Sequence, residues 1–168
     1  DPANPYANRD PRLAASVVTN GSTWNGRVID QSAGATDDMA NANASRTGYY
    51  LKKFLTDNLN LQQGQVAQHN WIAYRYAEVL LNYAEAMHEA YGPDAVPAGF
   101  TMSARQALQQ VRDRASVKLP KVIAADQEAF REAVKHERRV ELAFEDHRYW
   151  DLLRWKDAMD VLNNPVLG

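Results

Sequence analysis

Two glutamates, Glu137 and Glu141, stand where a helical segment would otherwise be apolar. With a helical period, Phe130, Val134 and Phe144 share one face, and both carboxylates fall in the middle of that face. A carboxylate on a buried face must be paired or hydrogen-bonded, because burying it alone costs several kcal/mol. The pattern therefore indicates either a pair of catalytic acids or an ion-pair lock that fixes how helices meet.

We favour the lock, because the stretch around the two glutamates is as rich in arginine as in acid. A planar guanidinium can hold a carboxylate through two hydrogen bonds, and such pairing keeps the acid ionised. The alternative is a glycoside hydrolase, which needs two carboxylates about 5 to 10 Å apart across a cleft. One helical turn gives that spacing, but the face that carries both acids should meet other helices. We expect no catalytic residues and a structural ionic lock made of Glu137, Glu141, Arg138, Arg139 and Arg148.

The sequence lacks the other common signatures of catalysis and metal binding. It has no cysteine, no glycine-rich phosphate loop, no Gly-x-Ser-x-Gly motif and no His-x-x-x-His pair among its four histidines. The polar segment 31–48 offers acidic and amide oxygens but lacks the glycine and distal glutamate of a calcium loop. We therefore expect no metal and no cofactor.

Composition limits the classes of partner that the chain is expected to bind. The 19 basic and 21 acidic residues give a net charge of −2, which argues against a nucleic-acid surface. No apolar run approaches the ~20 residues that cross a bilayer. With 45% hydrophobic residues, the chain can bury a core.

A binding site is better supported than a reaction site. Glycan sites combine an exposed aromatic ring, which packs on apolar sugar faces, with amide or carboxylate groups that bind hydroxyls. Trp24 is the best candidate, because it lies in a polar segment beside Asn20 and Asn25. An alternative of equal weight is that Trp24 folds back to anchor the loop. Tyr49 is a further, weaker candidate for ligand contact.

The sequence pattern in the first third of the chain predicts a β-hairpin and a loop. Segment 13–19 pairs with segment 23–29 through an Asn20-Gly21 turn, in which both residues tolerate positive φ, and Gly26 marks a bulge. Segment 31–48 has no large apolar residue except Met39, and it predicts a long exposed loop.

The remaining two thirds predict helices. The first spans residues 74–91, and the second begins at Ser103, where Gln106 completes a capping box. The third begins at Asp126 and ends near Phe144 or Glu145. A shorter fourth helix spans residues 149–161, and its inward side is expected to carry Trp150, Leu153 and Met159. We also place Trp71 and Trp155 in the core. The fold class is mainly α: one domain over residues 1–168, with packed helical hairpins of tetratricopeptide-like type, a small β-hairpin and long irregular loops.

Three motifs resemble a known family. Residues 137–155 read Glu-Arg-Arg-Val-Glu-Leu-Ala-Phe-Glu-Asp-His-Arg-Tyr-Trp-Asp-Leu-Leu-Arg-Trp, and this stretch resembles the signature near the C-terminus of the SusD/RagB family. Segments 74–86 and 8–13 match further motifs of that family in the expected order. The family consists of outer-membrane nutrient-binding lipoproteins of Bacteroidetes. Its members are much longer, so the chain resembles their C-terminal portion.

The resemblance implies a function that composition and spacing do not. It implies a non-enzymatic protein on the extracellular face of the cell outer membrane, which captures an oligosaccharide ligand and delivers it to a SusC-like TonB-dependent transporter. Membrane association would depend on a lipid anchor absent from this chain. One alternative is an interaction scaffold or lid that contacts the transporter, while an upstream region binds the sugar or peptide. A glycoside hydrolase is the least favoured alternative.

Overall fold

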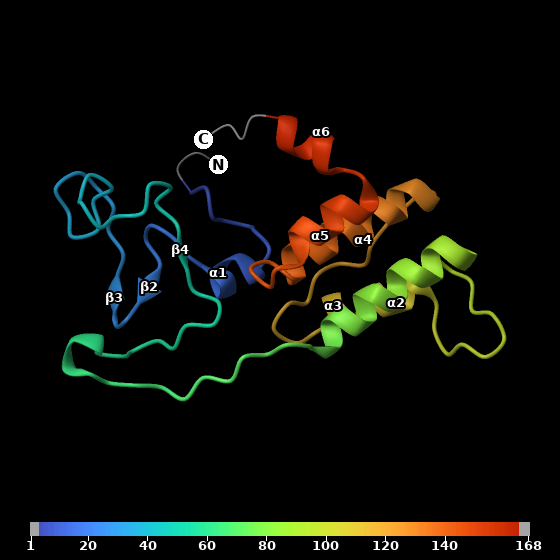
Figure 1. Cartoon of the computed structure of the whole chain (residues 1–168), viewed down its shortest axis with the longest axis horizontal. Helices are drawn as coiled ribbons and strands as arrows, with labels where there is room; N and C mark the ends of the chain where they lie inside the picture. The colour runs from blue at the N-terminus through green and yellow to red at the C-terminus, as the bar shows by residue number, and fades with distance from the viewer. Residues whose placement is uncertain (1–3, 165–168) are drawn as a thin grey trace. The chain divides into compact units, whose positions relative to one another are not determined.

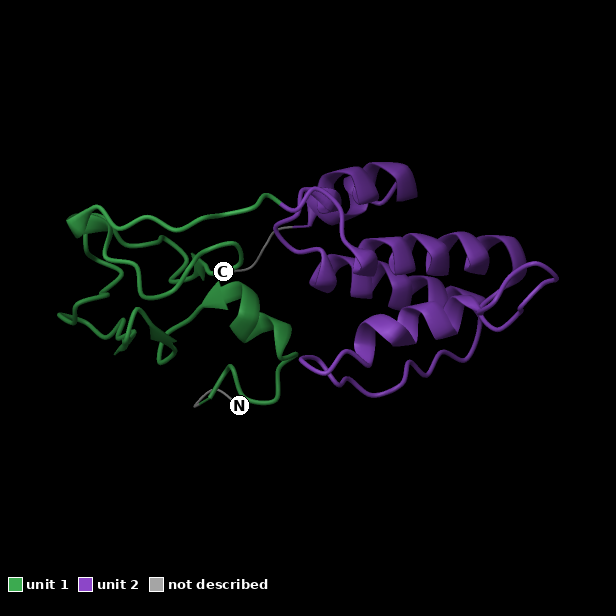
Figure 2. Ribbon diagram, turned by 90° about the horizontal axis from the view of Figure 1, so that it is seen from below, with its two compact units in different colours: residues 1–71, 166–168 green, residues 72–165 purple. Residues whose placement is uncertain are grey.

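The computed structural model describes residues 4–164, which hold six α-helices, a short 3-10 helix and four two-residue strands. The chain divides into two compact units: unit 1, residues 1–71 with 166–168, and unit 2, residues 72–165 (Figure 2). Most of the helical residues belong to unit 2, so the predicted mainly helical fold with a small β-hairpin is confirmed. A single domain over residues 1–168 stays a prediction. Between residues 4 and 164, every helix falls short of the length or apolar character that crossing a membrane requires.

The β-hairpin of unit 1 forms one turn later in the chain than predicted. Strand β2 (Thr23–Trp24) pairs with β3 (Arg27–Val28), and the two residues between them form the hairpin turn. Asn25 and Gly26 have φ values of 49° and 73°, the left-handed conformation that a two-residue hairpin turn requires. The predictions of a hairpin turn at Asn20-Gly21 and of a bulge at Gly26 were therefore wrong. Both dipeptides carry the same turn signal, and the sequence alone does not rank them.

The first predicted strand is largely a helix. Helix α1 (Arg12–Ser16) comes first, and the two residues of β1 (Val17–Val18) then pair antiparallel with β4 (Tyr50–Leu51). Asp10 accepts hydrogen bonds from the backbone N–H and the guanidinium of Arg12 at 2.9 and 2.6 Å, which tightens the first turn. Two alanines inside the helix favour it further. The two valines thus keep their predicted strand, and only the residues before them are helical.

Carboxylates hold the long polar loop of unit 1 in place. Asp37 binds the guanidinium of Arg27 at 2.6 Å and accepts a hydrogen bond from the backbone N–H of Asp30 at 3.0 Å. Asp38 accepts hydrogen bonds from the backbone N–H groups of Gly34 and Ala40 at 2.6 and 2.8 Å. These bonds replace the apolar contacts that the loop lacks. Within residues 4–164, no group of three or more histidine or acidic side chains is arranged to hold a metal ion.

Unit 2 is built from the helices that the sequence predicted, with changes at their ends. Capping bonds confirm two predicted starts: Ser103 and Gln106 form the capping box, and Asp126 accepts a hydrogen bond from Ala129 N–H at 2.8 Å. The helices, visible in Figure 1, are α2 (Tyr76–Tyr91), α3 (Ala104–Arg112), α4 (Gln127–Glu141), α5 (His147–Trp155) and α6 (Ala158–Asn163). Helix α2 packs against both α3 and α4.

The core of unit 2 lies between α2, α3 and α4. Its fully buried side chains include Leu81, Leu108, Phe130 and Val134. Ala84 and Ala107 are also buried in this cluster, and their small side chains let the helices approach closely. Burying these apolar side chains supplies the main free energy that holds the helices together.

Helix α4 ends earlier than predicted. Its last residue is Glu141, the next residue, Leu142, is buried, and Phe144 has a φ of 65° and is 52% exposed. The helical period therefore fails at Phe144, which leaves the buried face that Phe130 and Val134 share. A left-handed residue cannot continue a helix, and it turns the chain towards α5.

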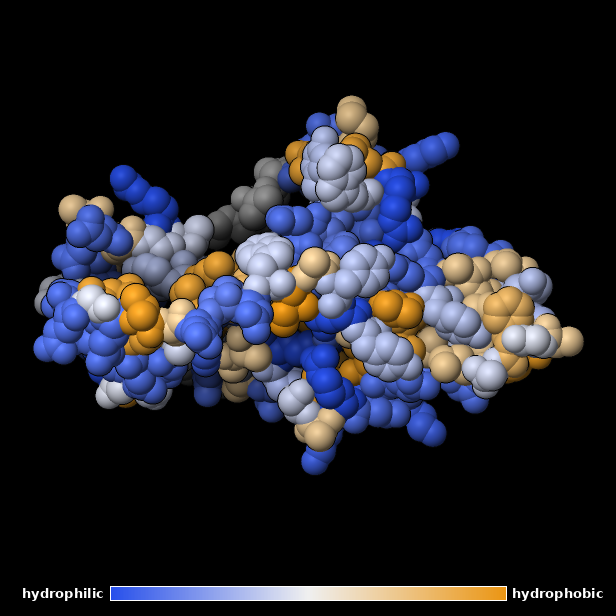
Figure 3. All heavy atoms as spheres, turned by 60° about the horizontal axis from the view of Figure 1, so that its bottom comes forward, coloured by the Kyte–Doolittle hydropathy of each residue, from blue (hydrophilic) through white to orange (hydrophobic). Residues whose placement is uncertain are grey.

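The fourth predicted helix is divided in two. Lys156 has a φ of 64° and ends α5, and α6 begins two residues later. The inward side of α5 carries Asp151 and Leu152, whereas Trp150 is 65% exposed. Leu153 and Met159 are also exposed, as is Trp71, so these four predictions of core residues were wrong; Trp155 is half-buried. Figure 3 shows a face on which apolar and aromatic side chains lie among charged ones.

The two glutamates of the opening pattern are buried and bound by arginines. Glu141 binds Arg75 at 2.6 Å and Arg114 at 2.7 Å, and Arg75 also donates to the backbone carbonyl of Glu141 and to Glu145. Glu137 binds Arg112 at 2.5 Å. Arg75 is the N-cap residue of α2, and Arg112 ends α3. These ion pairs therefore connect the ends of α2 and α3 to the last turns of α4.

Replacing Glu141 by alanine should lower the free energy of unfolding by about 3 kcal/mol or more, because two arginines lose a buried partner. Urea unfolding followed by circular dichroism measures this loss. The matched control is Glu132→Ala on the same helix, because the Glu132 side chain is 61% exposed beside Lys135. The control should cost less than about 1 kcal/mol. Equal urea midpoints for the two variants would contradict the buried ion-pair account.

The ion pair between Arg27 and Asp37 in unit 1 predicts a low pKa for the Asp37 carboxyl group. The guanidinium of Arg27 lowers the pKa of Asp37 to about 2, below the ordinary 3.8. The ionised pair therefore stabilises the folded chain above pH 3.8, and this stabilisation is lost as the pH falls from 3.8 towards about 2. An NMR titration of the side-chain carboxyl carbons measures the pKa directly.

Arg27→Gln should raise the pKa of Asp37 towards 3.8. Asp38 provides an internal control. The backbone N–H groups of Ala40 and Gly34 lower the pKa of Asp38, and Arg27 is not among the causes of that shift. An Asp37 pKa that stays the same in this variant would show that Arg27 is not the cause.

Candidate ligand-binding site

Unit 1 contains a hollow of about 490 Å³ whose lining carries no ionisable side chain. Side-chain amides alternate with leucines along it, and the lining residues are Asn25, Asn58, Leu59, Asn60, Leu61 and Gln62. An amide offers both donors and acceptors, and leucine offers an apolar surface. The hollow can therefore receive a ligand that has hydroxyl groups and apolar faces.

The hairpin turn and the segment after it hold each other in place. The backbone N–H of Asn25 donates to Asp57 at 2.7 Å, and the backbone N–H of Asn58 donates to the Asn25 side chain at 2.8 Å. Asn25 and Asn58 both have positive φ, which asparagine tolerates better than most residues. One side of the hollow is therefore fixed by two hydrogen bonds between the hairpin and segment 57–58.

A short 3-10 helix, η1 (Leu61–Gln63), forms the other side of the hollow. The side chain of Asn60 caps it by accepting a hydrogen bond from the backbone N–H of Gln63 at 3.2 Å, and Gly64 ends it in the left-handed conformation. The backbone N–H of Asn60 also donates to the Gln65 side chain at 2.9 Å. This turn leaves Leu61 and Gln62 exposed at the hollow.

Trp24 directly precedes Asn25 on β2 and is half-buried. The ammonium group of Lys52 lies 5.9 Å from the centre of its ring and donates to the backbone carbonyl of Ala14 at 2.9 Å. A cation over an aromatic face is a favourable contact. Trp24 thus combines features of both interpretations: contacts within unit 1 hold it, and part of its surface stays accessible.

The other two predicted ligand residues do not line this hollow. The side chain of Asn20 accepts a hydrogen bond from the backbone N–H of Gln31 at 3.0 Å, which gives Asn20 a structural contact. Tyr49 is half exposed, and its ring meets that of Tyr6 edge to face, with centroids 6.4 Å apart. Of the four predicted residues, only Asn25 belongs to the lining, and Trp24 precedes it in the chain.

Segment 58–62 was not predicted to be part of a ligand site. Its signal was the run Asn-Leu-Asn-Leu-Gln, in which amides alternate with leucines. No local pattern shows that this run meets the hairpin, because the connecting bonds span 32 and 33 residues.

The three arginines expected in the lock have different surroundings. Arg138 is buried and binds Asp151 at 3.0 Å and the Asn82 side chain at 2.6 Å. Arg139 is exposed. Arg148 is half-buried, and burial together with the charge of Arg139 lowers its pKa. The arginines that bind Glu137 and Glu141 lie instead in more distant segments of the chain, at positions 75, 112 and 114.

Glu137 and Glu141 lie inside the helical packing and do not line the hollow of unit 1. Both side chains are covered from solvent and carry arginine partners. A glycosidase needs its two carboxylates to reach opposite sides of a sugar bond in an open cleft. Glu137 and Glu141 instead lie where they form ion pairs with arginines of other segments of unit 2.

Two kinds of comparison connect the chain to known sequences. The model of the SusD family matches residues 1–167. SusD-like protein P25 of Formosa agariphila is 31% identical over 172 residues, which cover 90% of this chain and 30% of that protein. SusD-like protein P2 of the same organism is 30% identical over 167 residues and covers 95% of this chain and 30% of that protein.

A solved structure supports the same relationship. A SusD-like carbohydrate binding protein from Bacteroides fragilis is 34% identical and superposes with a TM-score of 0.75, covering 96% of this chain and 32% of the other. The chain thus spans about a third of the length of these relatives. Family model, sequence relatives and structure agree with the resemblance of the three motifs. The chain therefore belongs to the SusD family.

Proposed function

We propose that this chain contributes a glycan-binding surface to a protein that captures oligosaccharides at the cell surface. The uncharged, amide-lined hollow to which Asn25 and segment 58–62 contribute carries the proposal. The relative from Bacteroides fragilis is described as a carbohydrate binding protein, which supports the same class of ligand. Because the chain spans about a third of its relatives, the activity of the full-length protein is part of the proposal.

The chemistry of the hollow suits a neutral sugar. Each sugar hydroxyl both donates and accepts a hydrogen bond, and a carboxamide can satisfy both roles. The exposed side chains of Leu61 and Gln62 lie together at the hollow, so a sugar ring could place its C–H face and its hydroxyl edge on adjacent groups. Trp24 would extend the apolar surface at the hairpin.

We propose binding without chemistry on the ligand. The lining of the unit 1 hollow contains no carboxylate, which a glycosidase would use as acid, base or nucleophile. The acids that the sequence placed one turn apart, Glu137 and Glu141, are buried among helices. The proposed function requires only that the site hold the ligand, without making or breaking a covalent bond.

Delivery of the ligand is the second part of the proposal. Membership of the SusD family supports a place at the outer face of the outer membrane, with a lipid anchor and a SusC-like TonB-dependent transporter as partner. In the full-length protein, we place this chain in the C-terminal portion. Captured oligosaccharide would then pass to the transporter without being altered.

A second candidate function is an interaction scaffold or lid for the transporter, with sugar or peptide bound elsewhere in the full-length protein. One observation favours it: Tyr149 and Trp150 on α5 are exposed and meet edge to face, with centroids 5.2 Å apart. Exposed aromatic residues are frequent anchors at protein interfaces. The two candidates make different predictions for substitutions in unit 1.

Trp24→Ala and Gln62→Ala should each weaken oligosaccharide binding by about tenfold or more, because Gln62 lines the hollow and Trp24 is the proposed aromatic contact at the hairpin, each worth about 1 to 2 kcal/mol. Isothermal titration calorimetry with a panel of neutral glycans measures the affinity. Trp150→Ala is the control, because it removes an exposed tryptophan of unit 2. It should leave the affinity unchanged.

Equal affinities for the wild type and both unit 1 variants would move the ligand site elsewhere and favour the scaffold. Release of reducing sugar during the titrations would contradict binding without chemistry.

A further inference from the structure

Helix α2 carries an apolar stripe that is open to solvent. Five residues at steps of three, four, three and four form this exposed α2 stripe: Tyr76, Val79, Tyr83, Ala86 and Ala90. Tyr76 is 66% exposed and Val79 is 45% exposed; both alanines are exposed, and Tyr83 is half-buried. A surface helix ordinarily turns its apolar stripe towards the core, so a second, exposed stripe indicates a second packing partner.

The other sides of α2 are already used within unit 2. Leu81 lies in the core that α2 shares with α3 and α4. On the charged side, Glu85 binds Arg154 of α5 at 2.6 Å, and Glu89 binds Arg131 of α4 at 2.6 Å. The helical period places the exposed α2 stripe on the remaining side, between the core and these ion pairs. Its exposed residues are therefore available to a further element.

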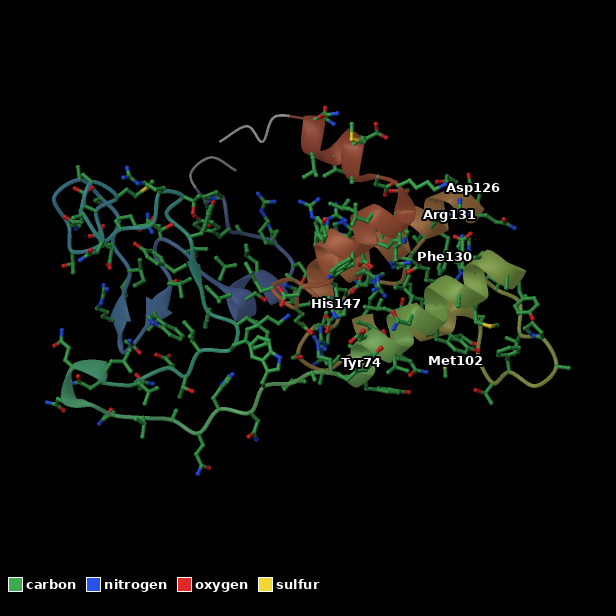
Figure 4. The ribbon with its side chains drawn as sticks, viewed as in Figure 1. Tyr74, Met102, Asp126, Phe130, Arg131 and His147 are labelled. Carbon is green, nitrogen blue, oxygen red and sulfur yellow. The ribbon has the colours of Figure 1, made fainter. Side chains whose placement is uncertain are left out.

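The loop after α2 holds this surface in shape and extends it. The hydroxyl of Tyr83 donates to the backbone carbonyl of Met102 at 2.7 Å, and Met102 lies beside α2 (Figure 4). The ring of Phe100 lies 6.3 Å from that of Tyr83 and 5.9 Å from that of Tyr91, measured between centroids. Phe100 and Tyr91 are both exposed. The apolar surface therefore continues past the stripe onto these two rings.

The spacing of the stripe fits a helix as its partner. Helices pack by placing rows of side chains three and four residues apart into the grooves of the other helix. Side chains of a strand alternate every two residues and match no such row. The small side chains of Ala86 and Ala90 let a second helix approach closely. Residues 76 to 90 cover about 21 Å, because each helical residue adds about 1.5 Å, so a helix of about four turns would cover the stripe.

The length of the relatives indicates where such a helix comes from. The fold described here matches 32% of the SusD-like structure from Bacteroides fragilis, so most of that chain lies outside the matched part. The two relatives from Formosa agariphila are matched over 30% of their length in the same way. A helix carried on the same chain has a high effective concentration at the stripe, whereas a second copy has to reach it by diffusion. A helix of the same protein is therefore favoured over a second copy.

We propose that the exposed α2 stripe is an interface inside the full-length protein, along which an amphipathic helix from outside these 168 residues packs. The inference rests on the proposed function only in placing this chain within a longer protein. The partner helix places large apolar side chains over Ala86 and Ala90, and its own small residues face Tyr76 and Val79. Unit 2 is thereby joined to the rest of the protein through α2.

The double variant Val79→Arg with Ala86→Arg tests the interface, because it places two charges on the stripe and arginine keeps the helix. In the full-length protein the melting temperature should fall by about 5 °C or more, since the charges would be buried without partners. In the 168-residue chain it should stay within about 2 °C, because both positions are exposed. Gln110→Arg on α3 is the control at an exposed position and should leave both melting temperatures unchanged. Calorimetric scans measure all of them.

Cysteine labelling gives a second readout that does not disturb the interface with charge. The 168 residues contain no cysteine, so Val79→Cys introduces one thiol that peptide mapping can follow. A maleimide should modify this thiol at least about tenfold more slowly in the full-length protein than in the 168-residue chain, because a covered thiol reacts only when the interface opens.

Three results would overturn the proposal. Equal labelling rates in the two proteins would show that nothing covers the stripe. An equal fall of both melting temperatures in the double variant would show that the stripe packs within unit 2. Sedimentation showing a full-length dimer that the double variant abolishes would make a second copy the partner. The proposed function fails separately, because loss of glycan binding at the unit 1 hollow would leave these melting temperatures and labelling rates as expected.

Discussion

The packing of unit 2 depends on carboxylates that are buried where α2 begins and where α3 and α4 end. Glu141 is the last residue of α4, Arg75 directly precedes α2, and Arg114 follows α3, so one carboxylate joins three chain segments. A buried charge tolerates few alternative arrangements, because each of them would leave it without a partner. Apolar replacements of a whole ion pair often keep stability, whereas loss of one partner is costly. We infer that these pairs mainly determine which helix arrangement forms.

Local signals predicted the helices, and long-range contacts determined what the sequence analysis missed. The capping box at Ser103 and the cap at Asp126 lie within one turn of the helices they start, so the sequence contains them completely. The partners of Glu141 lie 66 and 27 residues away, and adjacent arginines were the only candidates that spacing could suggest. Phe144 was misplaced for a related reason: helical periodicity does not indicate the residue at which a helix stops.

The candidate site of unit 1 could be predicted from the sequence only in part. Trp24 and Asn25 were identifiable, because an aromatic residue and amides stood together in a polar segment. Their partners on segment 58–62 were not, because only the fold brings that segment to the hairpin.

A double-mutant cycle on Glu141 and Arg75 tests most directly whether the buried acids are held by arginines. The free energies of unfolding of wild type, Glu141→Ala, Arg75→Ala and the double variant give the coupling energy between the two side chains. The account predicts a coupling of about 2 kcal/mol or more, because the two side chains form a direct ion pair at 2.6 Å and the Glu141 carboxylate is buried. A coupling below about 0.5 kcal/mol, with the two single losses simply adding, would contradict it.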